Sequence, residues 1–324
     1  MPAMIKVERL VKTFDKTNAV DDISFEVNEG ENMVLLGTSG CGKTTMLKML
    51  NRLIEPDSGN IFINGKNILQ QPPELLRRGI GYVLQNNGLF PHYTVGENIA
   101  IVPGLLKWDK EKTLNRINEL LEKLHLTKDQ LRAYPNELSG GQQQRIGLAR
   151  ALVANPPVLL MDEPFGALDN VTRSKIHDEF NALDELKRKT IIMVTHDVQE
   201  AFELADRIAL MDKGKIVQIG TPTELLFKPA NKFVSDFLKE QRLQLEFKSI
   251  KLTDIWGHLP NNGKHLTATL LAATSGVWEV LEAFKFSNGE NLNILNQQYK
   301  EVKSVTFEQL MMAFSQYKST QQHG

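Results

Sequence analysis

The sequence predicts an α/β protein, in which a parallel sheet with crossover helices is joined by an antiparallel β layer, a helical insert and a small α+β C-terminal module. Three observations predict this fold. Short alternating strands fill the chain from Ile5 to Val83, and helical periodicity replaces them between Pro91 and Pro156. Apolar strands separated by helices then return after Pro156, which is typical of a parallel sheet covered on both faces.

The antiparallel layer is predicted from alternating side chains and from turn residues such as Asn64-Gly65. We expect it to lean on a buried apolar strand that runs through a glycine-rich segment into a helix ending near Leu53. The expected strands of the layer are Ile5–Glu8, Ile23–Val27 and Asn60–Gly65, and the buried strand is Met33–Leu36.

The helical insert has its clearest helix over residues 110–125. One face of this helix gathers five apolar side chains, Leu114, Ile117, Leu120, Leu121 and Leu124. Parallel strands are expected at Val158–Met161, Thr190–Val194 and Ile208–Met211. After a polar stretch, the last module is expected to contain a helix at Val277–Phe284, a strand at Asn293–Leu295 and a helix at Phe307–Phe314.

Composition excludes several classes of protein. The formal net charge is −1, with 38 basic and 39 acidic residues, so no overall charge attracts nucleic acid or an anionic membrane surface. The single cysteine, Cys41, excludes internal disulfides. The N-terminus lacks the apolar core of a signal peptide, and no apolar run approaches the ~18 residues of a membrane span. We therefore expect a cytosolic chain that reaches a membrane only through a partner.

The segment Gly37-Thr38-Ser39-Gly40-Cys41-Gly42-Lys43-Thr44 matches the Walker A pattern, in which backbone N–H groups wrap a polyphosphate at a helix N-terminus. Lys43 would neutralise the β- and γ-phosphates, Thr44 would bind Mg²⁺, and Thr45 follows in the first turn of the helix. Cys41 is interpreted as a small residue that fits a tight turn rather than as a reactive thiol. The motif predicts that ATP and Mg²⁺ bind here.

Polar residues also end three of the apolar strands. Asp162 and Glu163 follow the strand at Val158–Met161, where Asp162 would hold Mg²⁺ and Glu163 would orient or deprotonate the attacking water. His196 and Gln85 end two other strands, and Gln85 would reach Mg²⁺ or the water. Taken alone, either residue more often belongs to a surface or a core than to a catalytic site.

The run Leu138-Ser139-Gly140-Gly141-Gln142 is a second phosphate-binding loop in a chain that already has one. Two such loops with one set of catalytic groups imply an ATP site that is divided between two chains.

These motifs, together with Ala167-Leu168-Asp169, stand in the order found in the ATP-binding subunits of ABC transporters, and the chain resembles that family over roughly residues 4–235. The resemblance implies an ABC cassette of the P-loop NTPase class, with a RecA-like parallel sheet. It further implies a nucleotide-binding domain at residues 1–240, with a helical subdomain at about 86–157, and a separate module at 241–324.

The resemblance also implies roles for single residues. Phe14 would stack on adenine, although an exposed Phe beside a strand could equally serve packing. Ser139, Gly140 and Gly141, with Gln142 beside them, would cap the γ-phosphate bound by a second copy of the chain. Asp169 would lie across the interface between the two copies. ATP would then hold the dimer closed until hydrolysis.

Partners follow from the same resemblance. Integral membrane permease subunits would dock at residues 86–94, where Gly88-Leu89-Phe90-Pro91 offers apolar groups, and an extracytoplasmic substrate-binding protein would take part indirectly. The chain would act peripherally at the cytoplasmic face of the cell membrane. Import is favoured over export because no membrane helices are fused to the cassette.

Several stretches resemble the osmoprotectant subgroup, which imports glycine betaine, choline and other quaternary amines. They are Asn51–Gly59, Gly88–Val95, and Asn98-Ile99-Ala100 with the segment running to Trp108. Importers of other small solutes, such as amino acids or polyamines, remain an alternative. Soluble ABC ATPases that act on DNA or ribosomes, or in iron–sulfur cluster assembly, resemble the chain less. The C-terminal module is interpreted as a single CBS-like regulatory unit or as a dimerisation tail.

Overall fold

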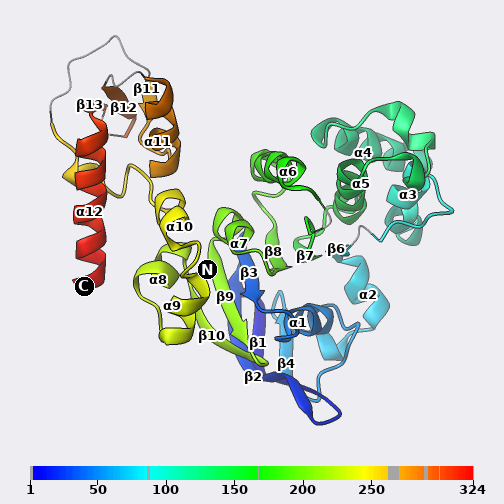
Figure 1. Cartoon of the computed structure of the whole chain (residues 1–324). Coiled ribbons are helices and arrows are strands. Elements are labelled where there is room, and N and C mark those ends of the chain that lie inside the picture. Colours follow the sequence, from blue (N-terminus) through cyan, green and yellow to red (C-terminus); the bar gives the residue numbers. More distant parts are fainter. Residues whose placement is uncertain are drawn as a thin grey trace. The chain divides into compact units, whose positions relative to one another are not determined.

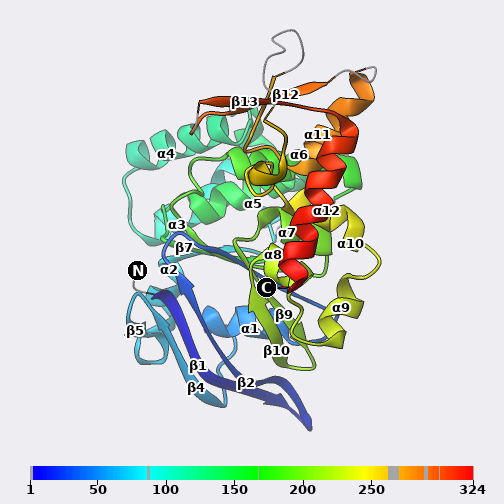
Figure 2. The ribbon, with the colours of Figure 1, turned by 90° about the vertical axis from the view of Figure 1, so that its left-hand side faces the viewer.

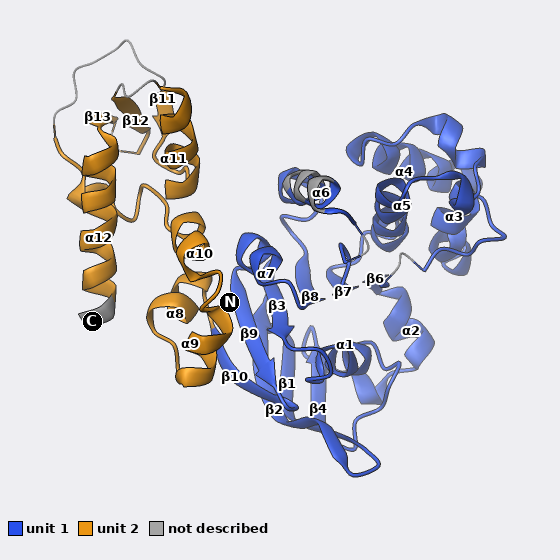
Figure 3. Ribbon diagram, in the orientation of Figure 1, with its two compact units in different colours: residues 1–219 blue, residues 220–324 orange. Residues whose placement is uncertain are grey.

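The computed structural model describes residues 3–85, 88–166, 168–261, 270–287, 291–298 and 300–323. The chain divides into two compact units, residues 1–219 and 220–324 (Figure 3). The sequence placed this division at 240/241. Residues 220–240 group with the second unit because the helix α8 (Pro222–Phe227) packs against α10 (Arg242–Ser249) and α12 (Phe307–His323).

The first unit is built on a six-stranded sheet in the order β10-β9-β3-β8-β7-β6, in which β9, β3, β8, β7 and β6 run parallel (Figure 1). Every residue of β7 and β8 is buried, as expected for central strands covered on both faces. The strands are β3 (Asn32–Gly37), β6 (Ile80–Val83), β7 (Val158–Asp162), β8 (Thr190–Thr195), β9 (Arg207–Asp212) and β10 (Lys215–Gly220).

The predicted antiparallel layer is a second sheet in the order β2-β1-β4-β5, seen in blue and light blue in Figure 2. Its apolar face, including Ile5 and Val7, shares one core with Met33 of β3 and with Met46 and Leu47 of the helix that follows the phosphate loop. The elements are β1 (Ala3–Phe14), β2 (Thr17–Asn28), β4 (Ser58–Ile63), β5 (Lys66–Asn67) and α1 (Lys43–Leu50). The first two strands are longer than the alternation indicated, because they continue into a hairpin whose register shifts repeatedly.

The helical insert lies between β6 and β7, as predicted. It consists of α3 (Val95–Leu105), α4 (Lys110–Lys123) and α5 (Gly140–Leu152), with short 3₁₀ turns at Lys128–Arg132 and Pro135–Glu137. The helix α2 (Pro73–Arg78) precedes β6. Of the five apolar residues on the predicted face of α4, Ile117, Leu120, Leu121 and Leu124 are buried, whereas Leu114 is exposed. Leu114 stands in the first half of the helix, and the buried residues of α4 lie in its second half.

The crossover helices of the first unit are α6 (Asn170–Ala182), between β7 and β8, and α7 (Val198–Leu204), between β8 and β9. They contact one another, and α7 also packs on β3. The helix α7 begins three residues after the end of β8, and α6 begins directly after Asp169, in the loop that follows β7.

The second unit is α+β, in agreement with the expected module. Its three strands pair in the order β11-β12-β13, with β11 and β12 parallel and β13 antiparallel to β12. Buried Glu246 of α10 contacts Arg242 and Lys318, and Phe247 stacks on Phe314, so α10 and α12 are tied together. The remaining elements are α9 (Lys232–Leu238), a 3₁₀ turn at Trp256–His258, β11 (Leu270–Ala272), α11 (Val277–Phe286), β12 (Leu292–Asn296) and β13 (Glu301–Val305).

None of the helices in the described part of the chain is both long and apolar enough to cross a membrane.

Candidate functional site

The phosphate loop connects β3 to α1 and requires glycine at two close approaches. Gly42 has φ +107°, and a Cβ there would lie 2.0 Å from the carbonyl oxygen of Ala19. Gly37 has φ +154°, and its Cβ would lie 2.2 Å from the carbonyl oxygen of Met211. A Cβ atom would clash with these carbonyl oxygens, so both positions require glycine. Residues of this loop and of the first turn of α1 line a cavity.

Lys43 is buried at the start of α1, and the loop itself holds its ammonium group. Lys43 Nζ donates to the carbonyl oxygens of Gly37 (2.8 Å) and Thr38 (2.9 Å). Cys41 is also buried, and burial raises the pKa of its thiol, although nearby Lys43 partly opposes this. The Cys41 thiol is therefore not an activated thiolate, in keeping with its interpretation as a small residue in a tight turn.

Thr44 and Asp162 meet beside the phosphate loop. Thr44 Oγ1 donates to Asp162 Oδ1 at 3.0 Å. Burial raises the pKa of the Asp162 carboxyl, and the hydrogen bond from Thr44 opposes the rise. Hydroxyl and carboxylate oxygens are ligands that Mg²⁺ prefers, so this pair fits the cation. Among the described residues, no group of three or more His, Cys, Asp or Glu side chains could hold a metal ion.

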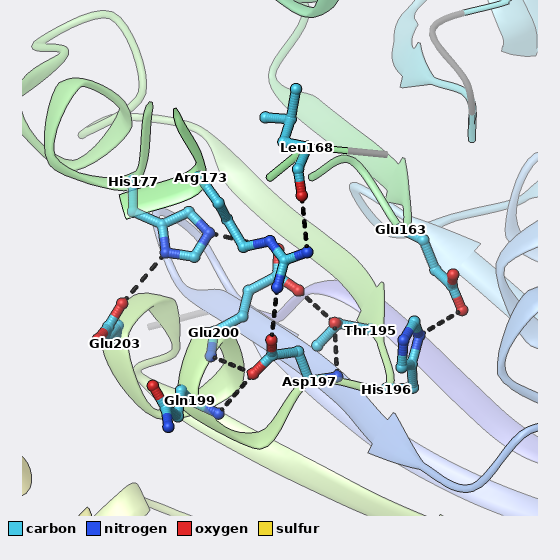
Figure 4. A network of polar contacts seen from close by, with 10 residues as sticks. All are labelled: Glu163, Leu168, Arg173, His177, Thr195, His196, Asp197, Gln199, Glu200 and Glu203. Carbon is cyan, nitrogen blue, oxygen red and sulfur yellow. Dashed lines mark hydrogen bonds and ion pairs between the residues drawn. The ribbon is translucent and has the colours of Figure 1, made fainter. Parts of the chain in front are cut away.

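Glu163 is the first residue beyond β7, and its backbone is unusual. Its φ is +43°, a left-handed conformation that is uncommon for a non-glycine residue, and its N–H donates to the carbonyl oxygen of Val194 at 2.9 Å. The carboxylate contacts two other predicted residues: Glu163 Oε1 lies 3.2 Å from His196 Nδ1 (Figure 4), and Gln85 Nε2 donates to Glu163 Oε2 at 3.1 Å.

Lys43, Thr44, Gln85, Glu163 and His196 line one open cavity of about 510 Å³. Its lining residues are Ala19, Ser39, Gly40, Gly42, Lys43, Thr44, Thr45, Gln85, Glu163 and His196. The structure therefore brings together phosphate-loop residues with the polar ends of three strands. Ala19 is the one lining residue that the sequence did not indicate, and its position follows from the close approach of its carbonyl to Gly42.

The other predicted site residues do not line this cavity. Phe14 stands at the tip of the β1–β2 hairpin, 46% exposed, with Lys12 Nζ 5.4 Å from its ring centre. Ser139 caps α5 through a reciprocal capping box with Gln142, and Gly140 is exposed at the same helix end. Asp169 caps α6, accepting from the N–H of Thr172 at 3.0 Å. Ala167 lies outside the described residues.

Sequence reasoning missed a polar network behind His196, shown in Figure 4. Asp197 caps α7 by accepting from the N–H groups of Gln199 and Glu200, and Arg173 of α6 binds its other oxygen. Buried Thr195 donates to Glu200. An Asp directly before a helix is a recognisable capping signal, but nothing in the sequence indicated its pairing with Arg173.

The comparisons with known proteins agree with this geometry. A family model described as ABC transporter matches residues 20–166. The chain is 42% identical to the glycine betaine uptake system ATP-binding protein YehX of Escherichia coli (strain K12), over 95% of this chain and 99% of that protein. The chain belongs to the ABC transporter family.

Two further likenesses refine the picture of this ABC cassette. The chain is 54% identical to the glycine betaine/carnitine/choline transport ATP-binding protein OpuCA of Bacillus subtilis (strain 168), over 74% of its own length. The matched region spans only 63% of the length of that relative. The solved dimer of the ATP-binding cassette MJ0796 in a post-hydrolysis state, bound to ADP and Pi, matches with a TM-score of 0.61 and 33% identity, over 67% of this chain and 98% of that one.

His177 gives the network a pH dependence. It is buried on α6, with Nδ1 3.1 Å from Glu203 and Nε2 3.7 Å from Glu200. Burial by itself would lower its pKa, but the two carboxylates outweigh burial and raise the pKa to about 9. Since this pKa lies above the ordinary value of 6.5, the protonated imidazole stabilises the fold below about pH 6.5, and that contribution is lost as the pH rises through about 9.

We therefore expect His177→Gln to lower the melting temperature by several degrees at pH 6.5 and by much less at pH 9.5. Thermal unfolding of both proteins across this range measures the difference, with the exposed His92→Gln as the control for the substitution itself. A difference that stays constant or grows with pH would contradict a charged His177.

Proposed function

We propose that this chain is the ATP-hydrolysing subunit of an ABC importer that takes up an osmoprotectant such as glycine betaine, choline or another quaternary amine. The observation that carries the ATPase part is the Glu163 carboxylate, held by His196 and Gln85 on the wall of the cavity that also contains the phosphate loop. A carboxylate in this position can accept a proton from a water that attacks the γ-phosphate.

The other residues of the site are proposed to bind the phosphates, Mg²⁺ and adenine. The N–H groups at the start of α1 bind phosphate oxygens, and Lys43 exchanges its loop carbonyls for the β- and γ-phosphates. Thr44, Asp162 and Gln85 are the residues that would hold Mg²⁺, which when bound would neutralise the phosphate charge. His196, 60% exposed, presents its second ring nitrogen to the γ-phosphate. Phe14 is exposed and suits stacking on adenine.

A second copy of the chain is proposed to complete each site. Ser139, Gly140 and Gly141 stand at an exposed helix N-terminus, where N–H groups and the helix dipole favour an anion, yet they do not line the cavity of their own chain. An ATP molecule between two copies would be contacted by the phosphate loop of one and by Ser139–Gln142 of the other. Asp169 would lie at the same interface. The dimeric state of the MJ0796 cassette supports this arrangement.

Transport is supported by the match to YehX over almost the whole length of both chains. Import of an amino acid or a polyamine is the alternative. In either case the specificity would belong to permease and extracytoplasmic binding-protein partners, and this chain would act peripherally at the cytoplasmic face of the membrane.

A docking surface for the permease is proposed at residues 88–94; Asn86 and Asn87, which belong to the predicted segment, lie outside the described residues. Phe90 and Tyr93 are exposed and contact one another, with ring centres 5.6 Å apart. Buried Asn98 fixes this loop through both the N–H and the carbonyl of Phe90, and Arg150 donates to the carbonyl of Gly88. A loop pinned by buried polar groups can transmit force to a partner.

The C-terminal module is proposed to regulate or dimerise the transporter. Its order β11-α11-β12-β13-α12 is consistent with a single CBS-like unit.

Glu163→Gln should bind ATP and lower its turnover at least about 100-fold, because an amide cannot accept the proton of the attacking water. MgATP should then hold the protein as a closed dimer, measured by size-exclusion chromatography with light scattering. Glu55→Gln is the charge-matched control, because it removes an exposed carboxylate that lies far from Glu163 in the sequence. Turnover at the wild-type rate would remove Glu163 from its role.

The divided site predicts complementation between two inactive variants. Lys43→Ala weakens ATP binding in its own chain, and Ser139→Arg blocks the site of the neighbouring chain. A heterodimer of the two contains one undamaged site, formed by Lys43 of one copy and Ser139 of the other. We expect the mixture to hydrolyse ATP while neither variant does so alone. An inactive mixture of well-folded, associating variants would argue for sites contained within one chain.

A measurement of uptake identifies the transported solute. The chain should be expressed with its co-purifying membrane subunits in cells that lack their own betaine uptake, and accumulation of radiolabelled glycine betaine and choline should be measured. We expect uptake that Lys43→Ala abolishes. Accumulation of spermidine or an amino acid instead would favour the alternative importer.

A further inference from the structure

The helix α6 lies between two loops of the proposed site. It follows the loop that contains Leu168 and Asp169, and it contacts α7, which follows His196. Its first turns also touch the start of α5: a Cβ on Gly141 would lie 3.3 Å from Thr172 and 3.4 Å from Ile176, so glycine allows this close approach. A movement of the Ser139–Gln142 loop or of Asp169 would therefore press on α6.

Arg173, at the end of the first turn of α6, joins the two loops directly. Its Nη2 donates to the carbonyl oxygen of Leu168 at 2.9 Å, and its Nη1 donates to Asp197 Oδ2 at 3.0 Å (Figure 4). The planar guanidinium presents these two donors in a fixed geometry, so the distance between the two acceptors is set by one rigid group. A lysine ammonium, which is a point charge on a flexible chain, would not impose that spacing.

Asp197 passes this constraint to His196. Its Oδ1 accepts from the N–H groups of Gln199 and Glu200, which anchors it to the first turn of α7, and its own N–H donates to Thr195 Oγ1 at 3.0 Å. Both neighbours of His196 in the chain are thus held, while the imidazole remains exposed and reaches Glu163. The position of His196 depends on these contacts because little else covers the ring.

We propose that Arg173 is a positioning residue for ATP hydrolysis, which couples the Leu168–Asp169 loop to His196 through Asp197. The inference rests on the proposed ATPase function and extends it. Asp169 and the Ser139–Gln142 loop would contact a second copy of the chain. That contact then positions His196 and Glu163 in the chain's own site. Each copy responds to closure over the other's ATP, and a monomer leaves His196 less well placed.

The simpler reading is that Arg173 and Asp197 form an ordinary ion pair. Both side chains are partly exposed, at 24% and 30%, and such a pair contributes little to stability. A purely stabilising role therefore predicts a small loss of stability and no change in catalysis. A positioning role predicts a loss of turnover that the change in stability does not explain.

The test compares variants of the full chain by steady-state release of phosphate from MgATP, with melting temperatures measured in parallel. Arg173→Ala removes both contacts. Asp197→Asn keeps an oxygen to cap α7 but removes the charge that Arg173 binds. Arg207→Ala is the matched control, since Arg207 also joins a carboxylate, Glu31 (2.9 Å), to a backbone carbonyl, that of Glu26 (3.3 Å), at the start of β9 and away from the cavity.

We expect Arg173→Ala to lower kcat about 10- to 100-fold while the KM for MgATP changes less than about twofold, because Arg173 does not line the cavity. Arg173→Lys should restore only part of the loss. The double variant Arg173→Ala/Asp197→Asn should turn over no more slowly than Arg173→Ala, since both changes break one connection. Arg207→Ala should keep the wild-type kcat at temperatures well below its melting point.

A kcat for Arg173→Ala within about twofold of wild type would overturn the inference, as would losses that multiply in the double variant. These outcomes are distinct from failure of the proposed function, in which the wild type and Arg207→Ala would also release no phosphate from MgATP.

Discussion

The parallel pairing of β6, β7 and β8 is the constraint on which the site depends. Val83 lies beside Met161, and Asp162 lies beside Val194, so the carboxyl ends of the three strands meet at one edge of the sheet. Gln85, Glu163 and His196 each follow one of these ends within two residues. Their side chains come from positions far apart in the sequence, and only the shared register brings an amide, a carboxylate and an imidazole within hydrogen-bonding distance.

Close packing then fixes the orientation of the groups that the strands deliver. Gly37 and Gly42 pass so near backbone carbonyls that no Cβ fits, which holds the phosphate loop opposite the strand ends. Glu163 adopts a left-handed φ that its surroundings enforce, with its N–H bound to Val194. Strain of this kind persists only where the neighbouring structure over-determines the backbone, and such positions cluster at functional sites.

A layer of charged groups supports the loops from behind. His177, Glu200 and Thr195 are buried together, and Arg173 with Asp197 continues the network towards His196. Buried polar groups are costly unless they are paired, so this network favours one arrangement of α6 and α7 over its alternatives. Purely apolar contacts between α6 and α7 would allow the two helices to shift against one another. The ion pairs between them favour one relative position instead. Because the network is rigid, a contact made at the Leu168–Asp169 loop can affect the position of His196.

The sequence by itself determined the class of fold, the phosphate loop and the order of the motifs, because these depend on local chemistry: glycines in a tight turn, apolar strands, and polar residues at strand ends. It also indicated three elements of the C-terminal module, which are α11, β12 and α12. Tertiary structure alone decided that Leu114 is exposed, that Phe14 and Ser139–Gln142 stand apart from the cavity of their own chain, and that Arg173 binds Asp197. An arginine on a helix is usually solvated, and periodicity carries no information about a partner 24 residues away, so only the packing of α6 against α7 could select it.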